Sequence, residues 1–150
     1  MNMTFPPVFH GAKLALFVGD DLAVILRDDS CDIPWPDCWD FPGGGREGDE
    51  TPIECALRET QEELGLCVDP CAVVWGKRFT SELGDEWFFV AHLAASVVDD
   101  IQLGDEGQCW TLMSPSAYYE HPKTISHLAG RLRVYQSGDL GDLTRKPPAV

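Results

Sequence analysis

Residues 44–66 read GGREGDETPIECALRETQEELGL and contain the clearest structural signals of the sequence. The middle part of this stretch begins a helix, because Thr51 suits the N-cap and Glu54, three positions later, reaches back to the cap. Apolar side chains then recur at helical spacing on one face, and Gly65 supplies a C-terminal stop. The pattern predicts a helix from about Pro52 to Leu64.

Three carboxylates share one flank of this predicted helix. Glu59 and Glu63 are one turn apart, and Glu62 lies beside them. Three negative charges this close repel one another unless a counter-charge is present, and carboxylate oxygens are the ligands that a hard cation such as Mg²⁺ prefers. A plain solvated acidic face is the alternative interpretation.

The loop before the helix holds three consecutive glycines, Gly43, Gly44 and Gly45. Without side chains, this backbone can approach a ligand closely, so that its amides and carbonyls meet a phosphate or a metal ion. A glycine loop that leads into a carboxylate-bearing helix indicates a metal–phosphate site.

The same residues resemble the Nudix box. The pattern comprises Gly44, five residues, Glu50, seven residues, Arg58, Glu59, Thr60, Gln61, Glu62, Glu63, Leu64, Gly65 and Leu66. Thr60 departs from the box, since the family usually has a large aliphatic residue there, and we expect looser packing at Thr60 but no loss of chemistry. The resemblance implies an α/β fold, the Nudix α/β/α sandwich with a mixed central sheet and the box helix packed on it.

The resemblance also implies a reaction, the hydrolysis of a pyrophosphate linkage by water with Mg²⁺, for which Mn²⁺ can substitute. Glu59, Glu62 and Glu63 would be the main metal ligands or the base, and the Gly44 carbonyl a further ligand. Which glutamate acts as the base is left open. Arg58 would orient one of these glutamates by ion pairing.

The flanks of the box extend the resemblance. Residues 39–44 are similar to the segment that leads into the box in MutT-like members, and residues 106–110 are similar to their late acidic segment. This similarity makes Glu106 the candidate for a fourth carboxylate, as metal ligand or base. A plain loop carboxylate is the alternative, and Glu82 and Glu86 compete for the role.

Four further residues are candidates for substrate contacts. Arg27 suits a phosphate as a bidentate donor, or is a solvated strand-end arginine. Phe41 and Trp110 would flank a base, although aromatic residues in a sheet are more often core. His121 stands where MutT-like members place a base-reading asparagine, and because a histidine offers different donors and acceptors, this departure counts against specificity for 8-oxo-guanine.

The MutT-like flanks favour a nucleoside triphosphate substrate, cleaved to the monophosphate and pyrophosphate. ADP-ribose, another nucleotide sugar and a capped RNA end are alternatives, as is a Nudix module that only binds a ligand. Because the box glutamates are all present, we favour an enzyme.

The whole chain has 150 residues and a formal net charge of −14. That charge repels polyanions, so we expect a small-molecule nucleotide substrate and no nucleic-acid polymer. We see no secretory signal, no apolar run of membrane length and no C-x-x-C pair among the six cysteines, which favours a cytoplasmic protein with no membrane partner. We expect one domain over residues 1–150, with a loose tail over residues 141–150, and leave a homodimer open.

Hydrophobic patterns outside the box predict the remaining elements. Strands are expected at residues 14–18, 22–27, 73–80, 87–94 and 109–113, and helices at residues 114–120 and 124–136.

Overall fold

The computed structural model describes residues 8–146 of the chain. The strands are β1 (Gly11–Val18), β2 (Asp21–Leu26), β3 (Trp39–Asp40), β4 (Gly43–Gly45), β5 (Val73–Ser81), β6 (Gly84–Leu93), β7 (Cys109–Met113) and β8 (Leu143–Thr144). The helices are α1 (Pro52–Leu64), α2 (Pro115–Glu120) and α3 (Ser126–Gln136), with 3₁₀ turns η1 (Pro70–Ala72) and η2 (Ala95–Asp100). Every strand and helix expected from the sequence is present, with ends that differ by up to three residues.

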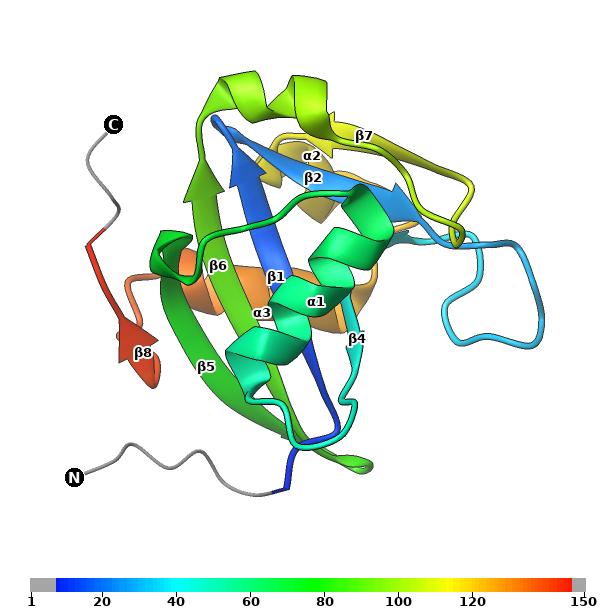
Figure 1. Cartoon of the computed structure of the whole chain (residues 1–150). Helices are drawn as coiled ribbons and strands as arrows, with labels where there is room; N and C mark the ends of the chain where they lie inside the picture. The colour runs from blue at the N-terminus through cyan, green and yellow to red at the C-terminus, as the bar shows by residue number, and fades with distance from the viewer. Residues whose placement is uncertain (1–7, 147–150) are drawn as a thin grey trace.

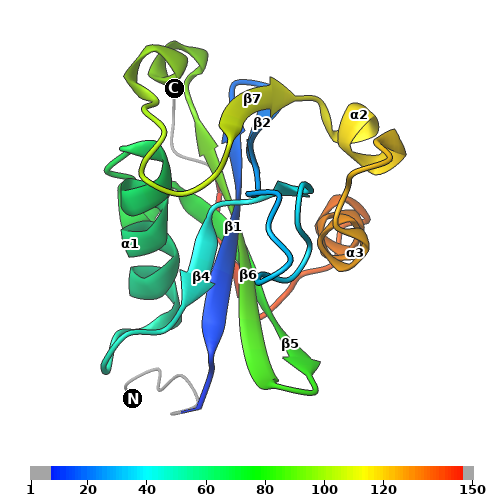
Figure 2. The same ribbon diagram turned by 90° about the vertical axis from the view of Figure 1, so that its right-hand side faces the viewer.

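All eight strands belong to one sheet, ordered β3-β2-β1-β6-β5-β8, with β4 also paired to β1 and β7 to β2. β1 and β6 are parallel, whereas the other pairs are antiparallel. α1 covers one face of the sheet, and α2 and α3 lie on the other (Figure 1 and Figure 2). The predicted α/β/α sandwich with a mixed sheet is confirmed. Within residues 8–146, no helix is long and apolar enough to cross a membrane.

β1 contributes to two apolar cores because alternate side chains of a strand face opposite sides. Leu14 and Leu16 belong to the core beneath α1, whereas Ala15 and Phe17 belong to the core beneath α3. The start of β1 pairs with β4, which consists of Gly43–Gly45 and which we call the glycine strand. The glycine strand is thereby held against the sheet beside α1. The central strand β1 thus fixes the position of the glycine strand relative to α1, and these are the two parts of the predicted site.

The box helix has the bounds that the sequence predicts. The Thr51 hydroxyl accepts a hydrogen bond from the Glu54 amide, the Thr51 amide donates one to the Glu54 carboxylate, and Gly65 ends the helix with φ at 69°. Thr60 is fully buried, and its hydroxyl donates to the Ala56 carbonyl at 2.8 Å. The threonine therefore fits the core without an unsatisfied donor.

The segment from residue 141 is ordered, so the prediction of a loose tail is wrong for residues 141–146. β8 pairs with β5, and the Arg145 guanidinium donates to the Val73 carbonyl at 3.0 Å and the Pro70 carbonyl at 2.7 Å. A two-residue strand has no hydrophobic pattern of its own and depends on partners far away in the sequence. The rest of the predicted tail, residues 147–150, lies outside the described residues.

Candidate active site

Six carboxylates line one pocket, which we call the acidic pocket. They are Glu47, Glu59, Glu62, Glu63, Asp105 and Glu106. The loop that leads into β7 lies across the C-terminal end of α1, where the Gly104 amide donates to the Glu63 carbonyl at 3.0 Å. The fold therefore brings Glu106 into the same pocket as the three box glutamates.

Arg58 is the centre of the ion pairs at this pocket. Its Nε and Nη2 donate to both carboxylate oxygens of Glu50, at 3.0 and 2.9 Å, and its Nη1 donates to Glu59 at 2.9 Å and Glu62 at 3.1 Å. Nη2 also donates to the Gly45 carbonyl at 2.9 Å. The bidentate bond from Arg58 lowers the pKa of Glu50 to about 2. Arg58 thus joins the glycine loop to the helix and fixes the orientation of two box glutamates.

Glu63 points inward from α1 and is partly buried. The Gly43 amide donates to its Oε1 at 2.8 Å. Burial nevertheless raises the pKa of Glu63 to about 7, against the lowering effects of nearby Lys13 and of this hydrogen bond. A carboxylate with a raised pKa beside other carboxylates in a pocket is typical of a functional site.

The glycine strand must be free of side chains where it meets α1. A Cβ on Gly44 would lie 2.7 Å from the carboxylate of Glu59. A Cβ on Gly43, whose φ is 144°, would lie 2.2 Å from the Ala12 carbonyl oxygen. Side chains here would displace either the carboxylate or the strand.

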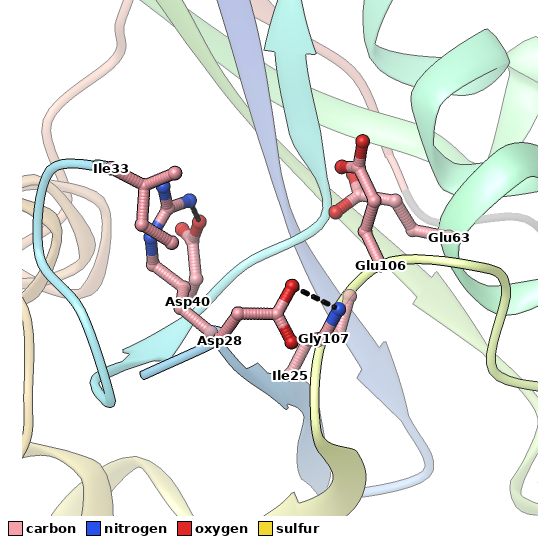
Figure 3. A pocket seen from close by; sticks show the side chains of 8 residues that line it. Ile25, Asp28, Ile33, Asp40, Glu63, Glu106 and Gly107 are labelled. Atoms are coloured by element: carbon pink, nitrogen blue, oxygen red, sulfur yellow. Dashed lines mark hydrogen bonds and ion pairs between the residues drawn. The ribbon is translucent and has the colours of Figure 1, made fainter. Parts of the chain in front are cut away.

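A second pocket, the middle pocket, shares Glu63 and Glu106 with the acidic pocket. Figure 3 shows these two side chains close together, Glu63 from α1 and Glu106 from the loop before β7, with Asp28 and Asp40 farther along the pocket. Arg27 also lines it, and its Nη1 donates to Asp40 at 2.9 Å. The middle pocket therefore places a guanidinium group next to the carboxylate cluster.

A third pocket, the aromatic pocket, shares Arg27 and Asp40 with the middle pocket. Its walls include Trp35, which is 42% exposed, and His127, and the two ring centroids lie 5.7 Å apart. Apolar side chains also line it, namely Leu83, Ile125 and Leu128. The three pockets are thus neighbours, and we call them together the groove: carboxylates lie at one end, Arg27 in the middle and aromatic rings at the other end.

Comparison with known protein families settles the relationship that the box suggests. Residues 9–131 match the family model described as NUDIX domain. This chain belongs to the NUDIX family. The match extends from the residues before β1 into α3, and so includes the whole groove-bearing part of the sheet.

Curated relatives of this NUDIX chain match it over shorter stretches. An RNA pyrophosphohydrolase of Halorhodospira halophila is 36% identical over 63 residues, which cover 39% of this chain and 35% of the relative. An 8-oxo-dGTP diphosphatase of Proteus vulgaris is 50% identical over 36 residues, which cover 24% and 32%. The chain therefore spans about a third of the length of these relatives.

A solved structure shows the same fold over most of the chain. The crystal structure of a MutT protein from Methanosarcina mazei Go1 superposes with a TM-score of 0.69 at 18% identity, covering 86% of this chain and 93% of that one. At this identity, the likeness concerns the NUDIX fold alone.

Three of the predicted substrate contacts lie outside the groove. Phe41 is fully buried and stacks on Tyr118 with ring centroids 4.8 Å apart, so the prediction that it flanks a base is wrong. Trp110 packs against the core beneath α1, and His121 meets Trp39 edge-on. Neither Trp110 nor His121 lines any of the three pockets. Of the predicted substrate contacts outside the glycine loop, only Arg27 lines the groove.

The sequence reading missed the aromatic end of the groove. Trp35 and His127 were not proposed as binding residues, nor was Lys13, whose Nζ donates to Asp40 at 2.9 Å and to the Gly43 carbonyl at 3.2 Å. Trp35 does carry a signal, because a tryptophan between two prolines in a polar loop has no strand or helix in which to be buried. Of the competing carboxylates, Glu86 lines the aromatic pocket, whereas Glu82 lines none of the three.

The donors of the acidic pocket fit a hard divalent cation. They are carboxylate oxygens, and the partly buried Glu63 lacks a cationic partner within ion-pair distance among the described residues. No three His, Cys, Asp or Glu side chains in residues 8–146 already have the arrangement of a metal site. Arg58 holds Glu59 and Glu62 in ion pairs, so these side chains must turn towards a bound cation.

Metal-dependent stability should therefore depend on pH. Because the pKa of Glu63 is raised in the folded protein, its contribution to stability is full below its ordinary pKa of 4.5 and is lost as the pH rises through about 7. Without a metal ion, the free energy of unfolding should fall by roughly 3 kcal/mol at most as the pH rises through this window. Mg²⁺ neutralises the ionised carboxylate, so its stabilising effect should be larger at about pH 8 than at about pH 5.

Thermal unfolding with excess MgCl₂ or EDTA at the two pH values measures this difference. An equal increase in Tm at both pH values would show that Glu63 does not contribute to cation binding.

Proposed function

We propose that this chain is a divalent-metal-dependent pyrophosphohydrolase that cleaves a nucleoside triphosphate to the monophosphate and pyrophosphate, with Mg²⁺ as the metal and Mn²⁺ as a substitute. The observation that carries the proposal is the order of the three neighbouring pockets, because their carboxylates, Arg27 and aromatic rings follow the order of metal, phosphates and base in a metal–nucleotide complex. The names of the two curated relatives, both pyrophosphate-cleaving enzymes, support the activity.

The acidic pocket supplies the residues that would hold the cation. Glu59, Glu62, Glu63 and Glu106 provide carboxylates. The Gly44 carbonyl, which accepts from Cys55 Sγ at 3.6 Å, would be a further ligand. A bound divalent cation would supply positive charge against the phosphate oxygens and make a neighbouring water easier to deprotonate. Arg58 holds Glu59 and Glu62 in ion pairs until a cation competes for them.

Two carboxylates are placed to take the proton of the attacking water. Glu63 and Glu106 both line the acidic and middle pockets, where the scissile phosphates would lie. If one of these two carboxylates binds the cation, the other takes the proton of the attacking water.

The middle and aromatic pockets would position the rest of the substrate. Asp40 accepts from both Lys13 and Arg27 at 2.9 Å, so these cations are fixed before a phosphate arrives. Trp35 offers an exposed ring face on which a base can stack, opposite His127.

A substrate panel tests the proposal. We expect Mg²⁺-dependent release of pyrophosphate from at least one nucleoside triphosphate, canonical or oxidised, and loss of the activity with EDTA and in a Glu59→Gln variant purified in the same way. The panel should also contain ADP-ribose, a nucleotide sugar, a dinucleoside polyphosphate and triphosphorylated and capped RNA. Turnover of one of these compounds alone would mean that the substrate is not a nucleoside triphosphate, although the hydrolysis of a pyrophosphate linkage would stand.

The competing hypothesis is a NUDIX module that only binds a ligand. No turnover of any panel member with Mg²⁺ or Mn²⁺, together with nucleotide binding that a Glu59→Gln change leaves unaltered, would favour that module over the enzyme.

A further inference from the structure

The loop that carries Glu106 is attached to the loop before β3 by side-chain hydrogen bonds. The Gly107 amide donates to Asp28 Oδ2 at 3.2 Å, a bond that Figure 3 shows beside Glu106. Gln108 makes the larger set, because its amide donates to the Leu26 carbonyl and its Nε2 donates to the Arg27 carbonyl and to Asp37 Oδ1, all at 2.8 Å. Both N–H groups of the Gln108 carboxamide are therefore used.

The chain cannot easily relax around this attachment. Gly107 has a φ of 95°, and a Cβ there would lie 2.8 Å from Ile25 Cγ2, so the backbone next to Glu106 is in close contact with β2. On the other side of Glu106, the Gly104 amide is bonded to the end of α1. The short segment between these contacts presents Glu106 to the acidic and middle pockets.

Asp37, the partner of Gln108, belongs to the loop that forms the aromatic end of the groove. It has a φ of 56°, an uncommon conformation for a residue other than glycine, and its Oδ2 accepts from Lys123 Nζ at 2.6 Å. Trp35, two residues earlier, has a φ of 52° and faces His127 in the aromatic pocket. One carboxylate thus connects the Trp35 loop to the loop of Glu106.

We propose, on the basis of the function proposed above, that Gln108 is a positioning residue that holds Glu106 in the acidic pocket and couples it, through Asp37, to the loop that receives the base. Removing the carboxamide leaves every pocket-lining side chain unchanged but removes the two side-chain hydrogen bonds that join the Glu106 loop to Arg27 and Asp37, while the backbone bonds of Gly107 and Gln108 remain. Outer-shell groups of this kind affect metal affinity and turnover through the ligand that they orient.

The test is a double-mutant cycle that combines Gln108→Met with Glu106→Gln. Gln108→Met keeps the length of the side chain and removes both donors. We expect it to weaken Mn²⁺ binding, measured by electron paramagnetic resonance without substrate, and to lower kcat, each by about ten- to a hundredfold, while KM changes little. In the Glu106→Gln background, Gln108→Met should cause almost no further loss, because the side chain it positions is already disabled.

Cys109→Ser provides the matched control, since Cys109 is the exposed residue directly after Gln108, at the start of β7, and lines none of the three pockets. Equal losses from Gln108→Met in both backgrounds, or no loss of Mn²⁺ affinity in the parent background, would overturn the proposal. If Gln108→Met does not fold, Asp37→Ala breaks the same connection and is judged by the same criteria. Failure of the parent to hydrolyse any panel substrate would refute the proposed function instead, while the Mn²⁺ measurement would still decide whether Gln108 positions Glu106.

Discussion

A Glu63→Gln variant is expected to lose about 10²–10⁴-fold in kcat on the best substrate of the panel. The glutamine keeps an oxygen that can accept from the Gly43 amide, so the local structure should persist. The glutamine lacks the negative charge that is needed to bind a cation or to accept a proton. We therefore expect kcat to fall while the variant still folds. Because burial of the ionised Glu63 is unfavourable, the metal-free variant should have a Tm at or above that of the parent at about pH 8.

The matched control is Glu120→Gln, the same chemical change at an exposed residue of α2 that lines none of the three pockets. It should leave both kcat and Tm unchanged. A Glu63→Gln variant that turns over substrate at the parental rate would remove Glu63 from the chemistry of the site.

Replacing Arg58 should produce the second large effect, on activity and stability together. Arg58→Ala leaves Glu50 without its bidentate partner and releases Glu59 and Glu62, so we expect a loss of about 2–4 kcal/mol in the free energy of unfolding at neutral pH. Activity should fall by at least about tenfold, since the two glutamates lose their orientation. Arg58→Lys should recover only part of either loss, because an ammonium group cannot form the same fork.

The pH dependence distinguishes this ion pair from a general loss of packing. Arg58 lowers the pKa of Glu50, so the stability it provides is present above pH 4.5 and is lost as the pH falls through about 2. The stability difference between the parent and Arg58→Ala should therefore shrink as the pH falls through this window. Urea unfolding at several pH values measures this difference in the free energy of unfolding, with Arg78→Met as the control at an exposed arginine. A difference between the parent and Arg58→Ala that stays constant down to acid pH would contradict the ion-pair explanation.

The parts of this fold that could be predicted are those with local causes. The bounds of α1 follow from the capping box at Thr51 and the stop at Gly65, both of which act within one turn. The short strands β3, β4 and β8 could not be predicted, because two or three residues carry no periodicity and pair only with strands brought close by the fold.

The residues of the candidate site also differ in whether the sequence could predict them. The box glutamates and Arg58 could be proposed because their spacing along one helix puts them on one flank, and Glu106 could be proposed only through the family resemblance of its segment. The aromatic pocket was missed because its walls come from separate parts of the chain. Trp35 in particular is placed by a loop whose conformation depends on the contacts of Asp37 with Gln108 and Lys123. Phe41 was misjudged because an aromatic residue beside a glycine loop gives no sign of which side of the sheet it faces.

If the proposed function is correct, the acidic pocket holds a divalent cation in contact with a nucleotide that lies along the groove. Crystals grown with Mn²⁺ and a non-hydrolysable nucleoside triphosphate, with data collected at the manganese absorption edge, test it most directly. We expect an anomalous peak in contact with carboxylate oxygens of the box glutamates, with the base against Trp35. A nucleotide bound elsewhere, or an acidic pocket without an anomalous peak although the nucleotide is bound, would contradict it.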